Sequence, residues 1–438
     1  MEKKRGRGFL IVFLIMMSAL TVYFVFNIFF SPYWDSVYAP TGYFSLASMR
    51  YPENDSETFT KEQACEDIDY LVKVLGRIHP DCIDSVPQEI LDCAEKQKQS
   101  FTDEVSSYDV WRACARVLHL FDDAHTMAGP SYSLDYLKEH KEIVASGAEL
   151  AAINGVSVGD IFHNNEELVS YELDPWGIRI VEGLVSTKEG LKYLGVYSDT
   201  LEYTYRYSDG SETVKTYSSK DFYSEAAMNT DETEDTPYSS QIISEKSAAI
   251  LTLDSCVYDM DFREFIYNFF KDINEKNIGS LVIDIRENSG GTSQVFDEIM
   301  IYLDHDKFST AGGEWRLGPY MMTWEPSEQK VTHMDDVSVF GGDVYVLTSN
   351  NTFSSGTLIA EYMQDNGFAT VIGEECGSMP AGYGDVSVFQ TPNAAVTFQV
   401  STKFFDRVNE ERRDEPLTPD IRTSKNMALL EAMDIISK

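Results

Sequence analysis

Residues 344–374 read VYVLTSNNTFSSGTLIAEYMQDNGFATVIGE: an apolar β-rich run, a polar turn, a helical pattern and a second short apolar run. Residues 280–285 (SLVIDI) form another apolar run, and a helical spacing follows over 294–303. Short apolar runs that alternate with helices are typical of a parallel sheet with helical crossovers. These stretches therefore predict an α/β fold with a mostly parallel sheet.

Two turns that follow these strands carry groups suited to chemistry. Ser354 and Ser355 lie between VYVLT and the next helical pattern, where the N–H groups of a helix N-terminus can stabilise an oxyanion. Gly290 and Gly291 follow SLVIDI, and paired glycines let a backbone approach a ligand closely. Each signal has an ordinary alternative, because serine is a common helix N-cap and paired glycines commonly make a turn.

A third candidate lies far upstream, in the sequence LFDDAHT at residues 120–126. His125 follows the end of a helical pattern and lies in a loop, not on an apolar face. His79 and His119 are better explained by packing or capping. No pair of histidines has the spacing of a metal site, so the sequence predicts neither a catalytic metal nor a cofactor.

The composition indicates a globular, strongly acidic protein. The chain has 438 residues, 43% of them hydrophobic, and its 72 acidic against 35 basic side chains give a formal net charge of -37. Nucleic-acid binding is excluded, because phosphate recognition needs clustered Lys and Arg. The same balance argues against an anionic bilayer surface as a partner of the main body, and the acidic side chains are expected to keep it soluble.

The N-terminal residues differ in kind from the rest. Four basic residues within 1–8 precede an apolar run over 9–30 that is broken only by Ser18, Thr21 and Asn27. About 20 helical residues cross a hydrocarbon core, and basic flanks stay in the cytoplasm. The pattern predicts a single-pass anchor in the cell membrane with an extracellular main body. A cleavable signal peptide is the alternative, although its apolar region is usually about 7–15 residues long.

An exported chain permits disulfide bonds between its six cysteines. No CxxC pair and no zinc spacing occurs. Cys82 and Cys93 are close enough in sequence to bridge, but a chain of this size does not require it. The cysteines are therefore expected to be small buried apolar residues.

The remaining patterns divide the chain into segments. Thr60 and Gln63 have the spacing of a capping box at the start of a helical region. The alternating residues LEYTYRY at 201–207 precede a turn sequence and predict a hairpin. The expected segments are a cytoplasmic tail at 1–8, a transmembrane anchor at 9–30, a stalk at 31–57, a helical subdomain that carries His125 at 58–135, a small β-rich insertion at 136–228, a linker at 229–240 and the α/β core at 241–438.

Four motifs in this order resemble the tail-specific, or C-terminal processing, serine peptidases. SLVIDIRENSGG is similar to their strand and Gly-Gly element, and residues 344–374 are similar to their nucleophile segment through QDNG and the closing GE. DDAHT resembles the D-x-H-T element of the histidine-using branch, to which the tricorn core peptidase is related, and PDI at 419–421 matches the closing motif. The resemblance covers about residues 60–425. It implies a core like that of the Clp protease and crotonase families, and INGVSVGDI at 153–161 resembles part of a PDZ-like module.

Carried residue by residue, the resemblance places the nucleophile at Ser354 and the histidine base at His125. The oxyanion donors fall on the backbone N–H groups of Ser355 and of Gly290 or Gly291. The serine–lysine branch of the family has its base in the loop after GE. Here that loop reads ECGSM and no lysine lies between 330 and 403, which favours the histidine as base.

The acidic partner of the histidine is less sharply indicated. The tricorn-like branch has a glutamate shortly before its P-D-I motif. Glu411, Asp414 and Glu415 all lie in the matching stretch, and Glu415 is the residue that we select.

The resemblance implies a serine-type endopeptidase that hydrolyses a protein or peptide substrate through an acyl-enzyme. One alternative is a catalytically inactive, membrane-tethered peptide-binding protein of the same fold, because the lysine is missing and the acidic partner aligns poorly. An acyl-CoA enzyme fits less well, since an exported domain has no coenzyme A and the sequence shows no basic cluster for its phosphates. The sequence does not indicate the natural substrate or the oligomeric state.

Overall fold

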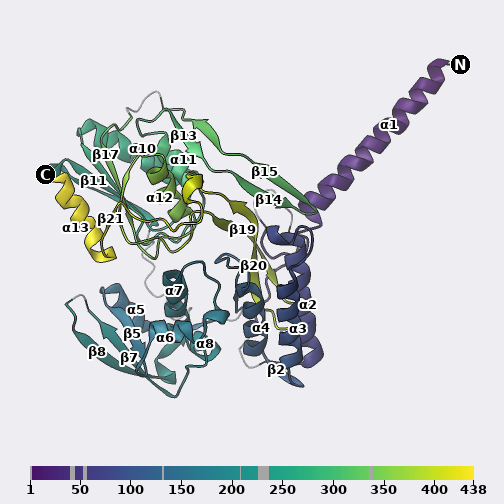
Figure 1. The fold of residues 1–438 in the computed structure, drawn as a ribbon, viewed down its shortest axis with the longest axis horizontal. Coiled ribbons are helices and arrows are strands. Elements are labelled where there is room, and N and C mark those ends of the chain that lie inside the picture. Colours follow the sequence, from purple (N-terminus) through teal and green to yellow (C-terminus); the bar gives the residue numbers. More distant parts are fainter. Residues whose placement is uncertain are drawn as a thin grey trace. The chain divides into compact units, whose positions relative to one another are not determined.

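A computed structural model describes residues 2–39, 45–52, 57–130, 133–207, 209–224, 236–334 and 339–438. The chain divides into two compact units, each assembled from segments distant in sequence. The first unit comprises Met1–Ser133, Glu314–Thr323 and Tyr383–Phe404, and the second comprises Leu134–Gly313, Trp324–Gly382 and Phe405–Lys438. Figure 1 shows the elements of both units.

The second unit is built on a six-stranded sheet. Its order is β10-β11-β12-β17-β18-β21, in which β10 pairs antiparallel with β11 and each of the other neighbours is parallel. The expected parallel arrangement applies to this sheet, whereas the pairings described in the other sheets are antiparallel. The strands are β10 (Tyr238–Ile243), β11 (Ala248–Leu253), β12 (Ser280–Asp284), β17 (Asp343–Thr348), β18 (Thr370–Gly373) and β21 (Ile421–Arg422).

Helices cover both faces of this sheet. The helices α10 (Met260–Glu275), α11 (Gln294–Met300) and α12 (Ser355–Asp365) share one hydrophobic core with the first face. The C-terminal helix α13 (Lys425–Ile436) packs Ala428 and Ala432 on the other face. All five residues of β12 are buried, because a strand covered on both faces exposes neither side to water. This covering explains why the central residues of the strand, 281–283, are all apolar.

The insertion in the second unit contains both helices and strands. Its four-stranded sheet has the order β6-β5-β7-β8, and β7 and β8 form the hairpin that the LEYTYRY alternation predicted. Helices α5 to α8 complete it, so the segment is less β-rich than expected. The elements are β4 (Asp135–Leu137), α5 (Lys138–Ala145), β5 (Glu149–Ile153), β6 (Val156–Ser157), α6 (Val158–His163), α7 (Asp174–Val185), α8 (Lys188–Tyr193), β7 (Thr200–Arg206), β8 (Glu212–Ser218) and β9 (Phe222–Ser224).

The first unit contains the predicted helical subdomain. Thr60 and Gln63 form the expected capping box at the start of α2, with reciprocal side-chain to backbone hydrogen bonds of 3.3 and 3.0 Å. The helix ends before His79-Pro80, where proline cannot continue it. Its elements are β1 (Thr58–Thr60), α2 (Lys61–Ile78), η2 (Pro80–Cys82), α3 (Gln88–Ser100), β2 (Glu104–Ser106), α4 (Ser107–His119) and β3 (Ala128–Gly129).

Strands from the C-terminal half of the chain complete this unit. The antiparallel partner of β3 is β20, which lies in a five-stranded sheet with the path β15-β14-β20-β19. The segment predicted as one contiguous α/β core at 241–438 therefore contributes to both units. These strands are β14 (Gly313–Leu317), β15 (Tyr320–Trp324), β19 (Gly382–Gln390) and β20 (Thr397–Phe405), while β13 (Lys307–Thr310) and β16 (Ser327–Lys330) pair in the second unit.

The N-terminal segment differs from the prediction of a transmembrane anchor over residues 9–30. The α-helix α1 (Glu2–Val25) gives way to a π-helical turn at Phe26–Phe30. In the described part of the chain, no helix is both long enough and apolar enough to cross a membrane. The single-pass anchor at 9–30 stays a prediction from the sequence.

The predicted stalk at 31–57 also differs where it is described. Tyr33 is buried, Tyr38 forms a β-bridge with Val388, and the Arg50 backbone N–H donates to the Gln390 side chain at 2.8 Å. The segment is held against β19 because it carries apolar and hydrogen-bonding groups that a free stalk would expose. Of the predicted linker at 229–240, residues 229–235 lie outside the described residues and 238–240 belong to β10.

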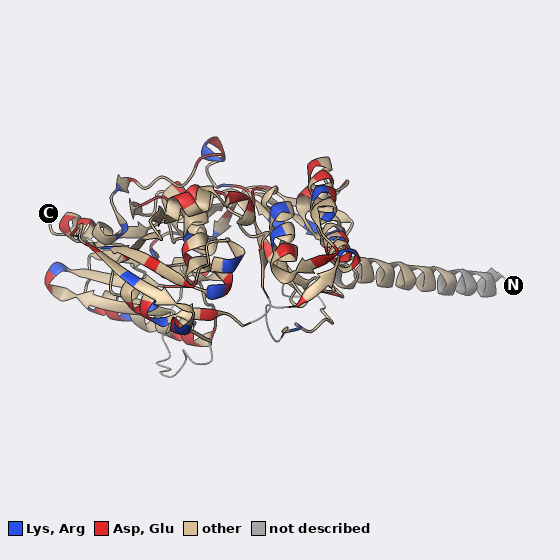
Figure 2. Ribbon diagram, turned by 90° about the horizontal axis from the view of Figure 1, so that it is seen from below, with Lys and Arg blue, Asp and Glu red and all other residues tan. Residues whose placement is uncertain are grey.

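All six cysteines are described residues with free thiols. Four of them, Cys82, Cys114, Cys256 and Cys376, are buried, as expected for small apolar side chains. The acidic side chains are spread over the elements of both units, in the red segments of Figure 2. This distribution agrees with a solubilising role for the excess negative charge.

Candidate active site

The predicted nucleophile lies at the junction between β17 and α12 in the second unit. Ser354 has φ 53° and ψ -122°, a conformation that a non-glycine residue rarely adopts. Such backbone strain costs about 1–3 kcal/mol and is found mainly at functional sites. Ser354 occupies the N-cap of α12, but among the described residues its side chain caps no N–H group. The ordinary explanation of this serine as a helix cap therefore does not apply.

Hydrogen bonds from neighbouring loops hold the strained residue. The Ser354 N–H donates to Ser378 Oγ at 3.0 Å, and the Ser354 carbonyl accepts the Leu358 N–H at 3.0 Å. The Phe353 N–H donates to the Asn288 carbonyl at 2.8 Å. These bonds fix the peptide groups on both sides of the serine, so its side chain is positioned by the backbone.

The Gly-Gly turn lies directly against the serine. Gly290 has φ 105°, and a Cβ there would lie 2.7 Å from Ser354 Cβ and 3.2 Å from Ser354 Oγ. Gly291 has φ 134°, and a Cβ there would lie 2.3 Å from the Cys256 carbonyl oxygen. Both positions require glycine for conformation and for space. The turn therefore lies close to the Ser354 side chain, and its approach to a ligand stays a prediction from the sequence.

The predicted oxyanion donors differ in the hydrogen bonding of their backbone N–H groups. The Gly290 N–H donates to Asn288 Oδ1 at 2.9 Å, within its own turn. Ser355 is the first residue of α12, whose opening N–H groups have no partner within the helix. Ser355 Oγ donates to the Gly291 carbonyl at 2.9 Å and so ties the two loops together. Gly291 is therefore a better candidate donor than Gly290.

An aromatic stack connects the insertion to the nucleophile loop within the second unit. The rings of Trp176, on α7, and Phe353 lie parallel at 4° with centroids 3.9 Å apart. Close by, Glu172 Oε2 accepts the Met379 N–H at 2.7 Å. Residues of the insertion thus contact both loops that hold Ser354, a connection that the sequence did not indicate.

The predicted base lies in the first unit, in the loop after α4. This loop is fastened to β20, because Met127 exchanges backbone hydrogen bonds with Gln399 and Thr126 Oγ1 accepts the Ser401 N–H at 3.0 Å. The His125 side chain is 14% exposed, and its Nδ1 lies 3.7 Å from Asp123 Oδ1. The same carboxylate oxygen accepts the His125 backbone N–H at 2.7 Å.

Asp123 is a fully buried carboxylate in contact with the predicted base. Burial alone would raise the pKa of Asp123, but its interactions with the neighbouring His125 and His79 outweigh burial and lower this pKa below its usual range. Asp123 therefore stays ionised, as a residue that orients a catalytic histidine must. The sequence does not single out Asp123, although it is the aspartate of the D-x-H-T element itself.

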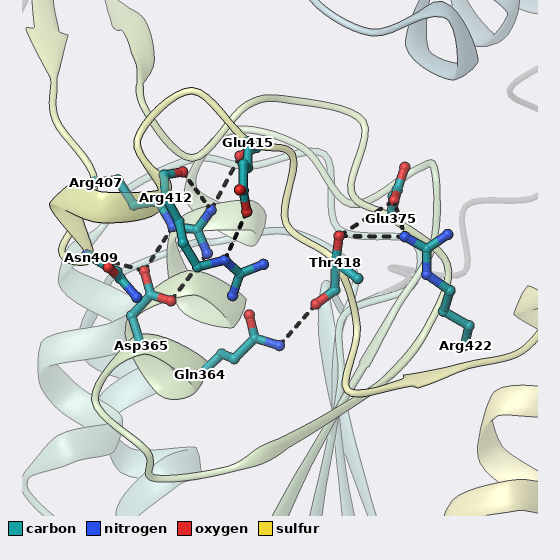
Figure 3. Close-up of polar contacts among 9 residues, drawn as sticks. All are labelled: Gln364, Asp365, Glu375, Arg407, Asn409, Arg412, Glu415, Thr418 and Arg422. Atoms are coloured by element: carbon teal, nitrogen blue, oxygen red, sulfur yellow. Dashed lines mark hydrogen bonds and ion pairs between the residues drawn. The ribbon is translucent and has the colours of Figure 1, made fainter.

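Glu415, the acidic partner predicted from the sequence, lies in the second unit. Its carboxylate pairs with Arg412 at 3.0 Å, its carbonyl accepts a hydrogen bond from Arg407, and its side chain is 60% exposed. Figure 3 shows it in the segment that Arg407 fastens to Asp365 of α12. Exposed pairs of this kind are common and contribute little stability.

The comparisons with known proteins agree with this fold. Residues 247–423 match the model of peptidase family S41. The resemblance to the tail-specific, or C-terminal processing, peptidases is thereby confirmed, and it supports a serine peptidase. No curated protein sequence matches the chain.

Two solved structures show the same architecture. Mature CPAF in complex with lactacystin is 12% identical, has a TM-score of 0.61 and covers 86% of this chain and 98% of its own. A putative peptidase from Parabacteroides merdae is 12% identical, has a TM-score of 0.50 and covers 86% of this chain and 97% of its own. At these identities the likeness shows the fold alone.

Proposed function

We propose that this protein is a serine-type endopeptidase in which Ser354 is the nucleophile. The observation that carries the proposal is the strained backbone of Ser354 at the start of α12, with Gly290 packed against its Oγ. A serine in such a turn is presented for attack, and the cost of the strain is repaid elsewhere in the fold. Membership of the matched segment in a peptidase family supports the same role.

In the proposed reaction, His125 accepts the proton of Ser354 Oγ while this oxygen bonds to the peptide carbonyl carbon. The carbon–nitrogen bond then breaks, and His125 returns the proton to the leaving amine. Water next attacks the acyl-enzyme, with His125 again taking and returning a proton, which releases the acid product and restores the serine.

We assign the orienting carboxylate to Asp123 in place of Glu415. Asp123 contacts His125 within one loop and is buried and ionised, whereas Glu415 is exposed and paired with Arg412. The backbone N–H groups of Ser355 and Gly291 are the proposed oxyanion donors. Each such donor is worth roughly 2.7–4 kcal/mol in known enzymes.

The substrate class that follows is a protein or peptide. A placement of the catalytic units outside the cytoplasm stays a prediction from the sequence, and a membrane anchor is not part of the proposal. Fractionation of cells that make the full chain, followed by immunodetection in the medium and the cell fractions, tests the placement.

The second candidate function is a peptide-binding protein of the same fold without turnover. The absence of a family lysine after the GE motif and the engagement of Glu415 by Arg412 favour it. It predicts binding of peptides without reaction at Ser354.

Labelling of the full chain with a fluorophosphonate probe separates the two. The peptidase proposal predicts labelling that disappears in Ser354→Ala and falls at least 100-fold in rate in His125→Ala. The matched control is Ser239→Ala, an exposed serine on the edge strand β10, which should label like the wild type. A folded wild type that resists the probe but binds peptides would favour the second function.

A further inference from the structure

A second histidine contacts the carboxylate that we assign to His125. His79 follows the last residue of α2, is fully buried, and places its Nε2 3.5 Å from Asp123 Oδ2. Its ring lies against Phe121, at a centroid distance of 4.1 Å, and against Tyr383 of β19, at 4.8 Å. As expected, His79 caps a helical turn and packs against aromatic rings. Neither role requires that its Nε2 face Asp123.

A backbone hydrogen bond defines which nitrogen of His79 carries the proton. The Asp81 N–H donates to His79 Nδ1 at 3.3 Å, so Nδ1 must present a lone pair. In a neutral imidazole the other nitrogen is then the donor. The proton of His79 is therefore on Nε2, which lies 3.5 Å from Asp123 Oδ2 and makes no hydrogen bond among the described residues.

The two oxygens of Asp123 have different partners. Oδ1 faces His125, whose backbone N–H it accepts. Oδ2 accepts the hydroxyl of Ser401 on β20 at 2.7 Å and faces His79 Nε2. A carboxylate held at both oxygens cannot rotate, so the oxygen facing His125 stays in place.

The other charged and titratable groups around His79 come from the three elements packed against it. Arg316 of β14 donates from Nη1 to the His79 carbonyl at 2.5 Å, on the backbone side of the residue. The Tyr383 ring of β19 packs on the His79 ring at an interplanar angle of 45°, and its hydroxyl donates to Asp81 Oδ1 of η2 at 2.6 Å. Burial and the nearby Asp81 carboxylate raise the pKa of Tyr383, so it stays neutral. Asp123 is thus the charged group that lies next to Nε2 of His79.

We propose that His79 is a positioning residue for the reaction at Ser354. Its Nε2–H lies 3.5 Å from the oxygen of Asp123 that Ser401 holds, and by interacting with the charge of Asp123 it tunes the proton affinity of His125. The inference rests on the proposed function, since it assumes that His125 is the base.

Replacement of His79 by a residue without an N–H group should change the pKa of His125. In His79→Phe, Asp123 loses a competing partner and interacts more strongly with His125, so the pKa of His125 rises. The acidic limb of the profile of kcat/KM against pH then moves to higher pH, and kcat/KM falls roughly 10-fold, as for other outer-shell partners. His79→Gln supplies an amide N–H near the position of Nε2 and should restore both quantities.

The test combines NMR titration of the full chain with the pH profile of fluorophosphonate labelling in wild type, His79→Phe and His79→Gln. We expect an Nε2–H tautomer of His79 in the wild type, an upward shift of the His125 titration in the phenylalanine variant, and its return in the glutamine variant. An Nδ1–H tautomer in the wild type would overturn the inference even if neither variant folds.

Other outcomes separate this inference from the proposed function. A lower melting temperature of His79→Phe, with an unchanged His125 titration and an unchanged pH profile, would show a structural role alone and overturn the inference. A wild type that neither labels nor hydrolyses peptides would overturn the proposed function, and with it this inference, whatever the His79 variants do.

Discussion

The loop that carries Ser354 and the loop that carries His125 are held in place by different forces. Ser354 is positioned by backbone geometry: a strained φ, hydrogen bonds to its flanking peptide groups, and a glycine that leaves no room for a Cβ. His125 is positioned by a buried charge, because Asp123 accepts its backbone N–H and faces its ring.

This difference predicts different sensitivities. A steric change of a single methyl group should disturb the serine loop at any pH, because close-packed atoms have no room to move. A change of one charge should disturb the histidine loop even if its shape is kept, because a buried carboxylate interacts strongly with its partners. The variants below test this contrast in order of expected effect.

Asp123→Asn keeps the shape and removes the charge, so it should have the largest effect. We expect kcat/KM for a peptide substrate to fall about 10³-fold or more, because the imidazolium formed in the reaction loses its counter-charge. The pKa of His125, measured by NMR, should fall for the same reason. Loss of hydrogen bonds to a charged group should lower the free energy of unfolding by about 1.5–3 kcal/mol.

Asp122→Asn is the matched control, because Asp122 is the exposed neighbour of Asp123 and asparagine tolerates its φ of 48°. It should leave both kcat/KM and the His125 titration close to wild type. Equal losses in the two variants would mean that the net charge of the loop matters and not the contact of Asp123 with His125.

Gly290→Ala tests the steric side of the comparison. The new Cβ would lie 2.7 Å from Ser354 Cβ, so the serine must move, and we expect the fluorophosphonate labelling rate to fall about 10²-fold. Gly367→Ala is the control, since Gly367 has φ 72° and a Cβ at this position would have nothing within 4 Å. Gly367→Ala should lose about 1 kcal/mol of stability from backbone strain and keep its reactivity, whereas Gly290→Ala should lose more stability because of the clash, and reactivity as well.

Trp176→Ala should have a smaller effect, because the ring stacks on Phe353 and not on Ser354 itself. Such aromatic pairs are worth about 0.5–1.5 kcal/mol, which corresponds to a loss of roughly 2- to 10-fold in labelling rate if the stack orients the serine loop. Trp176→Phe keeps an aromatic face and should retain most of the rate. Identical rates in Trp176→Ala and wild type would show that the insertion does not position the nucleophile.

The smallest effect on activity is expected from Glu361, a buried acid on α12 whose replacement should change stability alone. Burial raises the pKa of Glu361 to about 8, although the Val408 N–H that it accepts opposes this shift. The folded state therefore retains a proton that the unfolded state releases, and the stability from this group falls as pH rises from about 4.5 to about 8. Glu361→Gln should be more stable than wild type in urea unfolding at pH 9 and equal to it at pH 4.

Asp123 gives the opposite pH dependence. Its pKa is lowered in the folded state, so its contribution is complete above the unfolded value of about 3.9 and is lost as pH falls below it. Comparison of Asp123→Asn with wild type should show a stability difference at pH 7 that shrinks toward pH 2. A difference that grows at low pH would contradict the ionised state assigned to this residue.

Much of the candidate site could be predicted because its signals are local. The turn after β17 and the glycine pair after β12 follow strands whose apolar runs are plain in the sequence, and both loops lie at one end of the same sheet. Asp123 was missed because a carboxylate next to a histidine in sequence gives no sign of its burial. Glu415 was selected from its place in a motif, and a motif does not reveal that Arg412 engages the side chain.

The alternation of strands and helices, the capping box of α2 and the strand-turn-helix around Ser354 could be predicted from the chain alone, because these features depend on residues a few positions apart. Three other features became visible in three dimensions. The strands β14, β19 and β20 complete the unit that contains α2, α3 and α4, Asp123 lies between two histidines, and the segment after residue 30 packs on β19. Most of these features depend on contacts between residues far apart in the chain. Such contacts follow from burial and packing in three dimensions, which no local pattern records.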